Sequence, residues 1–275
     1  MKKLFFLTFT LLLVILSEKG FSKQKTFYKD KRIVINIVSG KEFLSRNEDT
    51  LLFAVKISIA KGWHIYWVNP GDAGTPTLLS VSTNLECKNL IGPLFPIPKR
   101  KVYNKIVTFE HSGTLYFPFA VILDKPISSN KIEISLDAKW LICKEKCIPC
   151  EARISKKFAI NTKLPHSDYD YKVGYAFSNF PRDTVKGKIE FFDDFSLFHI
   201  DFQENPNVER VFFFPKTEGL FDIGEYPTFK FQDNKLVIKI NNLRYAWGDK
   251  SLIEGLLEME FSKGNKKYFW VKIVN

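Results

Sequence analysis

The chain has 275 residues, with 41 Lys and Arg against 30 Asp and Glu, so its formal net charge is +11 at pH 7. Its basic residues are scattered, which argues against a nucleic-acid-binding protein because such binding needs a clustered basic footprint. The 27 phenylalanines stand mostly at alternating positions, where we expect them to fill the cores of β-sheets. A chain of this length forms one large domain or two smaller ones.

The first residues have the pattern of an export signal. Lys2 and Lys3 give a basic start, and residues 4–17 are uncharged and rich in Leu and Phe. This apolar run is too short to span a bilayer comfortably, and the small residues just before Lys23 favour cleavage there. We predict a signal peptide at residues 1–22 and a mature protein of net charge +9, soluble and periplasmic or otherwise exported. An uncleaved N-terminal membrane anchor is the alternative.

The next segments alternate apolar and polar residues with a period of two, which is typical of half-buried β-strands. They comprise residues 33–38, 54–59 and 131–142, whereas 115–123 is a run of β-branched and aromatic residues and 152–160 is predicted to be a return strand. The pattern is cleanest in 131–142, which predicts an antiparallel strand. If that strand continues, Cys143 falls on its more polar face, so we expect the sulfur of Cys143 to be accessible at the end of the strand.

A linker rich in polar residues and proline follows at 161–168, and a second series of short strands begins after it. The predicted strands and hairpins of this series are 188–202, 211–214, 228–240, 252–261 and 267–274. Many short strands separated by turn residues are typical of β-sandwiches. We therefore predict an all-β chain with two β-sandwich domains, at residues 23–163 and 164–275.

The cysteines give the strongest chemical signal in the chain. Cys143, Cys147 and Cys150 lie within eight positions, and the fourth cysteine is Cys87. In an exported chain, clustered thiols indicate structural disulfides, thiol–disulfide exchange or soft-metal binding. A bond between Cys143 and Cys147 closes a very short loop and stabilises the fold little, and the lysines beside them favour the reactive thiolate. These features favour a redox pair.

Two other classes of protein remain open from these residues. Three thiolates suit soft metals, so a copper or zinc binding protein is one alternative, with His64 or His111 approaching in space. The other is a structural adaptor whose disulfides only stabilise it, since four cysteines permit three full pairings. If Cys143 and Cys147 form a redox pair, no metal or other cofactor is predicted.

Several motifs carry a resemblance to a known family. The run Trp-Leu-Ile-Cys-Lys-Glu-Lys-Cys-Ile-Pro at residues 140–149 resembles the redox segment of the N-terminal periplasmic domain of DsbD-like thiol:disulfide interchange proteins, above all their suppressor-of-copper-sensitivity branch. Residues 62–77 (Gly-Trp-His-Ile-Tyr-Trp-Val-Asn-Pro-Gly-Asp-Ala-Gly-Thr-Pro-Thr) and 92–98 fit further motifs of that domain. A weaker resemblance to the second β-domain of these proteins runs through residues 212–222.

The resemblance implies an immunoglobulin-like first domain that relays reducing equivalents, which would make the chain a thiol–disulfide oxidoreductase. Cys143 and Cys147 are the catalytic pair that carries over. A short aromatic loop caps this pair in the best-known branch, and residues 98–105 with Tyr103 are the candidate here, although Tyr103 also fits an ordinary loop aromatic. The second domain is expected to be a scaffold or docking module without chemistry of its own.

Two departures from the family shape the expected partners. The membrane electron-transfer and thioredoxin domains of its large members have no counterpart in this sequence. The expected electron donor is therefore a membrane thiol carrier or an exported thioredoxin-like protein, and the expected substrates are exported disulfide-containing proteins, with no nucleic acid. Cys150 stands where an acidic residue is expected, and it is predicted to act as a resolving thiol, to join Cys87 or to complete a metal site. Cys87 also fits a half-buried free thiol.

Overall fold

A computed structural model describes residues 25–40, 43–45, 47–161, 171–178, 180–181, 183–202 and 207–274. The predicted signal peptide and the domain boundary predicted near residue 163 lie outside these ranges. Nearly all regular elements in the described part of the chain are strands, so the predicted all-β fold is confirmed. The helices found there are short, and none has the length and apolar character needed to cross a membrane.

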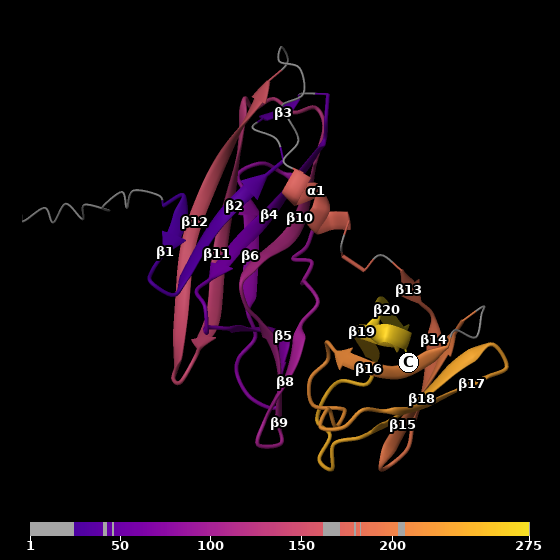
Figure 1. The fold of residues 1–275 in the computed structure, drawn as a ribbon. Helices are drawn as coiled ribbons and strands as arrows, with labels where there is room; N and C mark the ends of the chain where they lie inside the picture. The colour runs from indigo at the N-terminus through magenta and orange to yellow at the C-terminus, as the bar shows by residue number, and fades with distance from the viewer. Residues whose placement is uncertain are drawn as a thin grey trace, which may run out of the picture.

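The first sandwich consists of two sheets that face each other (Figure 1). One sheet has the order β1 (Phe27–Lys29), β2 (Ile33–Ser39), β4 (Thr50–Ile59), β10 (Thr114–Leu123), β7 (Cys87–Ile91). The other has the order β3 (Phe43–Ser45), β12 (Cys147–Asn161), β11 (Lys131–Cys143), β6 (Leu78–Thr83). Neighbouring strands run antiparallel except for β3 and β12, which are parallel.

The alternation predicted from the sequence builds the core of this sandwich. Every second residue of β2, β4, β10 and β11 points inward, because successive side chains of a strand lie on opposite faces. Phe53 and Phe119, which are register partners on β4 and β10, stack with ring centroids 5.3 Å apart. Helix α1 (Tyr171–Ser178) packs on the same two strands through the buried Val173. This helix follows the predicted linker, yet it belongs to the first sandwich by its contacts.

The second sandwich is formed by two four-stranded sheets. Their orders are β13 (Thr184–Val185), β20 (Lys266–Val274), β19 (Leu252–Phe261), β16 (Val208–Pro215), and β14 (Gly187–Phe191), β15 (Phe195–Asp201), β18 (Lys235–Asn241), β17 (Thr228–Gln232). The predicted hairpins at 188–202 and 228–240 form as β14–β15 and β17–β18. A 3-10 turn η1 (Ser262–Gly264) joins β19 to β20, which pair with each other. Phe198, Phe213 and Leu257 are among the buried residues of its separate core.

A third, three-stranded sheet lies between the two sandwiches, with the order β5 (Ile65–Gly71), β9 (Ile106–His111), β8 (Lys99–Tyr103) (Figure 1). The segment expected to be a cap loop is therefore largely a strand. It turns into β9 through Asn104 and Lys105, which both have positive φ angles, 48° and 73°. Two such residues are the mark of a tight hairpin turn that matches the strand twist.

One face of the three-stranded sheet is buried against the second sandwich. Val107 and Phe109 of β9 pack on Phe212 and Phe214 of β16, with the Phe109 and Phe214 rings 5.1 Å apart. The buried Asn69 side chain also donates a 2.8 Å hydrogen bond to the carbonyl oxygen of Pro215. This apolar cluster joins the two sandwiches into one packed unit.

Candidate functional site

The cysteine pair lies where the longest hairpin of the chain turns. β11 ends at Cys143 and β12 begins at Cys147, and the two residues are direct partners in the antiparallel register. Directly opposed residues on neighbouring strands project from the same face at close range. Their sulfurs are joined in a disulfide of 2.04 Å, and the three residues between them form an exposed turn.

The two sulfurs differ in accessibility. Cys143 is only 1% exposed, whereas Cys147 is exposed. The expectation that the Cys143 sulfur would be accessible is therefore wrong. A backbone bridge covers the end of β11, because His64 and Cys143 exchange N–H to C=O hydrogen bonds of 3.0 and 2.9 Å. An attacking thiol can therefore reach the disulfide most directly at Cys147.

Tyr66 covers the disulfide from β5. Its hydroxyl donates a 3.4 Å hydrogen bond to Sγ of Cys143 and lies 4.0 Å from Sγ of Cys147. Thr77 fixes the backbone of this residue by donating a 2.6 Å hydrogen bond to its carbonyl oxygen. Gly74 has a φ of +110°, and a Cβ atom there would lie 2.6 Å from the Tyr66 ring. Glycine at position 74 therefore leaves space for the tyrosine.

Burial raises the pKa of Tyr66, and the neighbouring Glu110 and Tyr103 raise this pKa further. The hydroxyl consequently stays protonated at neutral pH and remains a hydrogen-bond donor toward sulfur. Tyr66 lies inside the 62–77 motif, but nothing in the sequence predicts its contact with the cysteines, because the contact spans 77 positions.

Glu110 forms the second layer of the site. It is buried and faces Tyr66 across the β5–β9 register. Thr108 donates a 2.7 Å hydrogen bond to one carboxylate oxygen, and the hydroxyl of Tyr103 lies 3.5 Å from the other. Nε2 of His64 lies 3.5 Å from the same carboxylate, and burial lowers the pKa of His64 although Glu110 opposes this shift. The disulfide is thus backed by a buried, hydrogen-bonded polar network.

Tyr103 belongs to this network without contacting the sulfurs in the described structure. It ends β8 with its side chain half exposed, and it reaches the disulfide by way of Glu110 and Tyr66. The aromatic side chain that contacts the disulfide is Tyr66. A capping role for Tyr103 stays a prediction.

Cys150 and Cys87 are both free thiols. Cys150 lies opposite Trp140 and packs against the core of the first sandwich, and burial raises the pKa of its thiol. It lies three residues beyond Cys147, so the alternation of the strand turns the two side chains to opposite faces. Cys87 is exposed at the start of β7, in the facing sheet. The structure therefore does not bring these two thiols to the Cys143–Cys147 site.

The geometry also bears on the metal-binding alternative. In the described parts of the chain, no three His, Cys, Asp or Glu side chains are grouped so that they could hold a metal ion. His111, one of the two histidines considered, is 2% exposed, and its ring packs edge-on against Phe117. Burial lowers the pKa of His111 to about 3, with a smaller contribution from Lys99. It is a neutral core histidine.

Comparison with known proteins tests the family resemblance. Residues 36–159 match the family described as thiol:disulfide interchange protein DsbD, N-terminal, so the resemblance carried by the cysteine motif is confirmed. No curated protein matches the chain in sequence.

Solved structures extend the likeness to both sandwiches. The N-terminal periplasmic domain of ScsB from Proteus mirabilis has a TM-score of 0.61 and 13% identity, covering 91% of this chain and 97% of that one. At this identity the likeness shows the fold alone. The CupB2 chaperone from Pseudomonas aeruginosa, at 10% identity over 85% of this chain and 98% of its own, has a TM-score of only 0.22, which is too low to indicate a shared fold.

Proposed function

Since residues 36–159 belong to the DsbD N-terminal family, we propose that this chain is an exported thiol–disulfide interchange protein that relays reducing equivalents through Cys143 and Cys147. The observation that supports this most is the unequal exposure of one disulfide, whose outer sulfur is open to solvent and whose inner sulfur accepts a hydrogen bond. A purely structural disulfide has no need of one exposed and one buried sulfur. The loop that this bond closes is short, so the bond lowers the entropy of the unfolded chain only a little.

Reduction of the disulfide begins at the exposed sulfur. A thiolate of a reduced dithiol partner attacks Sγ of Cys147, forms a mixed disulfide and releases Cys143 as a thiolate. The Tyr66 hydroxyl, already 3.4 Å from that sulfur, stabilises the leaving thiolate by a hydrogen bond. The partner's second thiolate then attacks the partner's sulfur of the mixed disulfide and releases Cys147. Two electrons and two protons pass to the pair, and the partner leaves oxidised.

Delivery of electrons runs the same exchange in reverse. The Cys147 thiolate attacks a disulfide of an exported substrate protein and expels one substrate sulfur as a thiolate. Cys143 then attacks Sγ of Cys147, which re-forms the internal disulfide and frees the second substrate sulfur. The network behind Tyr66 has a positioning role in both directions, because burial of this tyrosine beside Glu110 places its hydroxyl as a donor next to the sulfur.

The donor and the compartment follow from this chemistry. Recharging needs a dithiol, and we propose a membrane thiol carrier or an exported thioredoxin-like protein as its source. Exchange passes through a mixed disulfide, so the partner must present its sulfur directly at the exposed turn between β11 and β12. An oxidising compartment such as the periplasm supplies the disulfide substrates.

The proposal is tested by titrating the purified protein with glutathione buffers of known ratio and following the alkylation state of each cysteine by mass spectrometry. We expect Cys143 and Cys147 to change together from bonded to reduced within the range that glutathione spans. A pair that stays oxidised throughout that range is a structural bond, which would contradict the proposal. Reduced thiols with stoichiometric copper or zinc in the native protein would also contradict it, in favour of metal binding.

A further inference from the structure

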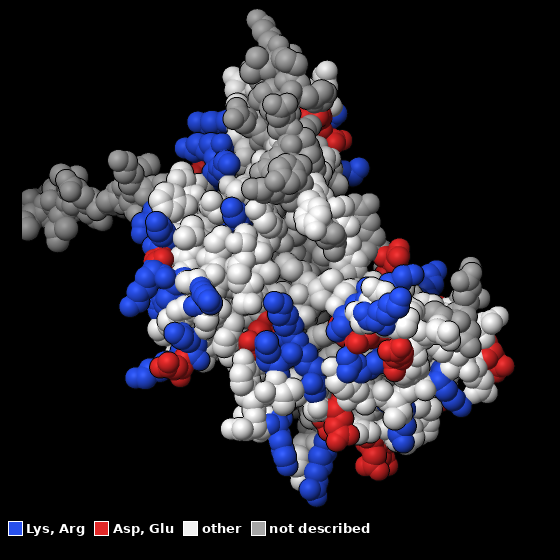
Figure 2. All heavy atoms as spheres, in the orientation of Figure 1, with Lys and Arg blue, Asp and Glu red and all other residues white. Residues whose placement is uncertain are grey.

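A pocket of about 300 Å³ opens between β8 and the second sandwich, away from the two sulfurs. Lys99, Arg100 and Lys101 line it from one side, and Lys266 and Glu258 line it from the other. Figure 2 shows blue Lys and Arg spheres, with a few red ones, gathering where the lower part of the first body meets the second. Neither sandwich contains the whole pocket, because three of its cations come from the three-stranded sheet and one from the second sandwich.

The charge of this pocket is unbalanced. Four of its lining side chains are cations and one is an acid, which gives a net charge of +3. The acid is already engaged, since Glu258 accepts hydrogen bonds from Lys266 at 2.7 Å and from the Tyr268 hydroxyl at 2.9 Å. Lys99 and Lys101 form no ion pair with any residue in the described ranges.

Arg100 is held rigidly at the pocket wall. One terminal nitrogen donates to the carbonyl oxygens of Ile223, at 3.1 Å, and Gly224. Its guanidinium carbon lies 5.2 Å from the ring centres of both Phe212 and Tyr226. Nε of this arginine is nevertheless buried without a hydrogen-bond partner among the described atoms. A buried donor on a cation is costly to leave unpaired, so this arginine retains unused hydrogen-bonding capacity beside the pocket.

We propose that this pocket binds a small free oxyanion, of the carboxylate or phosphate class, between the two sandwiches. A guanidinium whose direction is fixed presents donors in the planar pattern that suits carboxylate and phosphate oxygens, and flanking lysines add charge without fixed geometry. The volume equals that of roughly ten water molecules, which suits inorganic phosphate or a small polycarboxylate. The inference does not depend on the redox activity of the disulfide.

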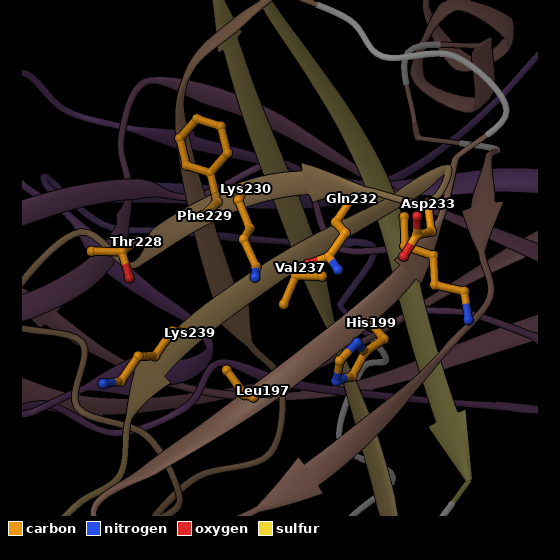
Figure 3. Close-up of a pocket in the computed structure, with 10 residues that line it drawn as sticks. Leu197, His199, Thr228, Phe229, Lys230, Gln232, Asp233, Val237 and Lys239 are labelled. Atoms are coloured by element: carbon orange, nitrogen blue, oxygen red, sulfur yellow. The ribbon is translucent and has the colours of Figure 1, made fainter.

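A second basic pocket provides the matched comparison. It has a volume of about 560 Å³ on the outer face of β15, β17 and β18, and Lys230 and Lys239 line it (Figure 3). Removing two lysines there changes the net charge of the protein as much as removing Lys99 and Lys101. The comparison therefore separates specific binding in the pocket beside β8 from general attraction of anions to a basic protein.

The test is calorimetric titration of the full mature protein with inorganic phosphate and with citrate, at constant ionic strength. We expect measurable binding that weakens at least ten-fold in the double variant Lys99→Gln/Lys101→Gln and changes less than two-fold in Lys230→Gln/Lys239→Gln. Thermal unfolding without ligand checks that both variants fold, and saturating ligand should raise the melting temperature of the unsubstituted protein by a few degrees.

Three results would overturn the inference. They are the absence of binding for both anions, equal weakening in the two double variants, and tight binding of an acidic peptide by a protein that binds neither free anion. The titration does not measure thiol exchange. A protein that binds no anion could still exchange disulfides, and a protein without exchange activity could still bind the anion.

Discussion

The two sandwiches share one architecture and differ in what they bury. The first sandwich and the three-stranded sheet next to it bury several polar side chains, including Asn69, Thr77, Thr108, Glu110 and His111. The second buries an apolar core, with Ser196 and Glu258 as its buried polar residues among those described. Burying polar groups costs stability unless each finds a partner, so their concentration on this side of the molecule is consistent with the function proposed for it. In the proposed function the chemistry lies there, and the second sandwich supports the sheet behind the disulfide.

The largest expected effect separates the four thiols of the first sandwich. Replacing Cys143 or Cys147 by Ser should abolish complete reduction of a substrate disulfide, because a single remaining thiol stops at the mixed disulfide. Cys87→Ser and Cys150→Ser should retain this activity within about two-fold, since their thiols are free and lie away from the pair. Turnover of a protein disulfide substrate with dithiothreitol as the reductant measures this. Equal losses in all four variants would contradict the assignment of the pair.

The next effect concerns the contact between the sandwiches. Phe109→Ala removes a fully buried ring that packs against Phe212 and Phe214, so we expect a loss of about 3–5 kcal/mol in the free energy of unfolding. Phe27→Ala, on an exposed edge strand, is the matched control and should cost less than about 0.5 kcal/mol. Urea unfolding measures both. Similar costs for the two variants would show that the sandwiches are not packed on each other.

The free energy of unfolding should depend on pH through the buried His111. The folded pKa of His111 is lowered to about 3 from its ordinary 6.5, so the unfolded chain takes up a proton between these values while the folded chain does not. Stability should therefore be complete above pH 6.5 and fall by about 1.4 kcal/mol per pH unit toward pH 3. His111→Gln should flatten this slope in urea unfolding curves collected between pH 4 and pH 7. An unchanged slope in the variant would show that His111 is not its source.

The smallest effect concerns the hydrogen bond to the inner sulfur. Tyr66→Phe keeps the ring and removes the hydroxyl that donates to Cys143, so exchange should slow about ten-fold as the leaving thiolate loses a charge-assisted hydrogen bond. Stability should change by less than about 1 kcal/mol. Stopped-flow reduction of the disulfide by dithiothreitol gives the rate. Tyr103→Phe is the comparison, and an equal slowing there would move the positioning role to the outer tyrosine.

The strands of both sandwiches could be predicted because their patterns are local. The alternation in 131–142 and 152–160 located β11 and most of β12, and the second half's hairpins were found by the same signal. The three-stranded sheet was missed because β5 pairs with a β8–β9 hairpin from a separate segment and itself contains Asn-Pro-Gly, which is typical of a turn. Helix α1 was missed because it follows a segment with the composition of a linker.

The site could be predicted only as far as its cysteines. Their spacing indicated the Cys143–Cys147 pair, but the strand alternation predicted an accessible Cys143 sulfur, whereas Cys143 is buried. The cover comes from Tyr66, which is 77 positions away in sequence, and from the bridge to His64. Glu110 was missed for the same reason, since its burial depends on the pairing of β5 with β9. Long-range packing, rather than periodicity, decides which half of this disulfide is exposed to solvent.

The most direct test of the account compares the two single-cysteine variants as traps. In cells, Cys143→Ser leaves the exposed Cys147 thiol, and Cys147→Ser leaves the buried Cys143 thiol. The account predicts that Cys143→Ser accumulates disulfide-linked adducts with thiol-redox partners, identified by mass spectrometry after rapid acid quenching. Cys147→Ser should accumulate few. Abundant adducts on Cys147→Ser alone, or none on either variant, would contradict the claim that exchange proceeds through the exposed sulfur.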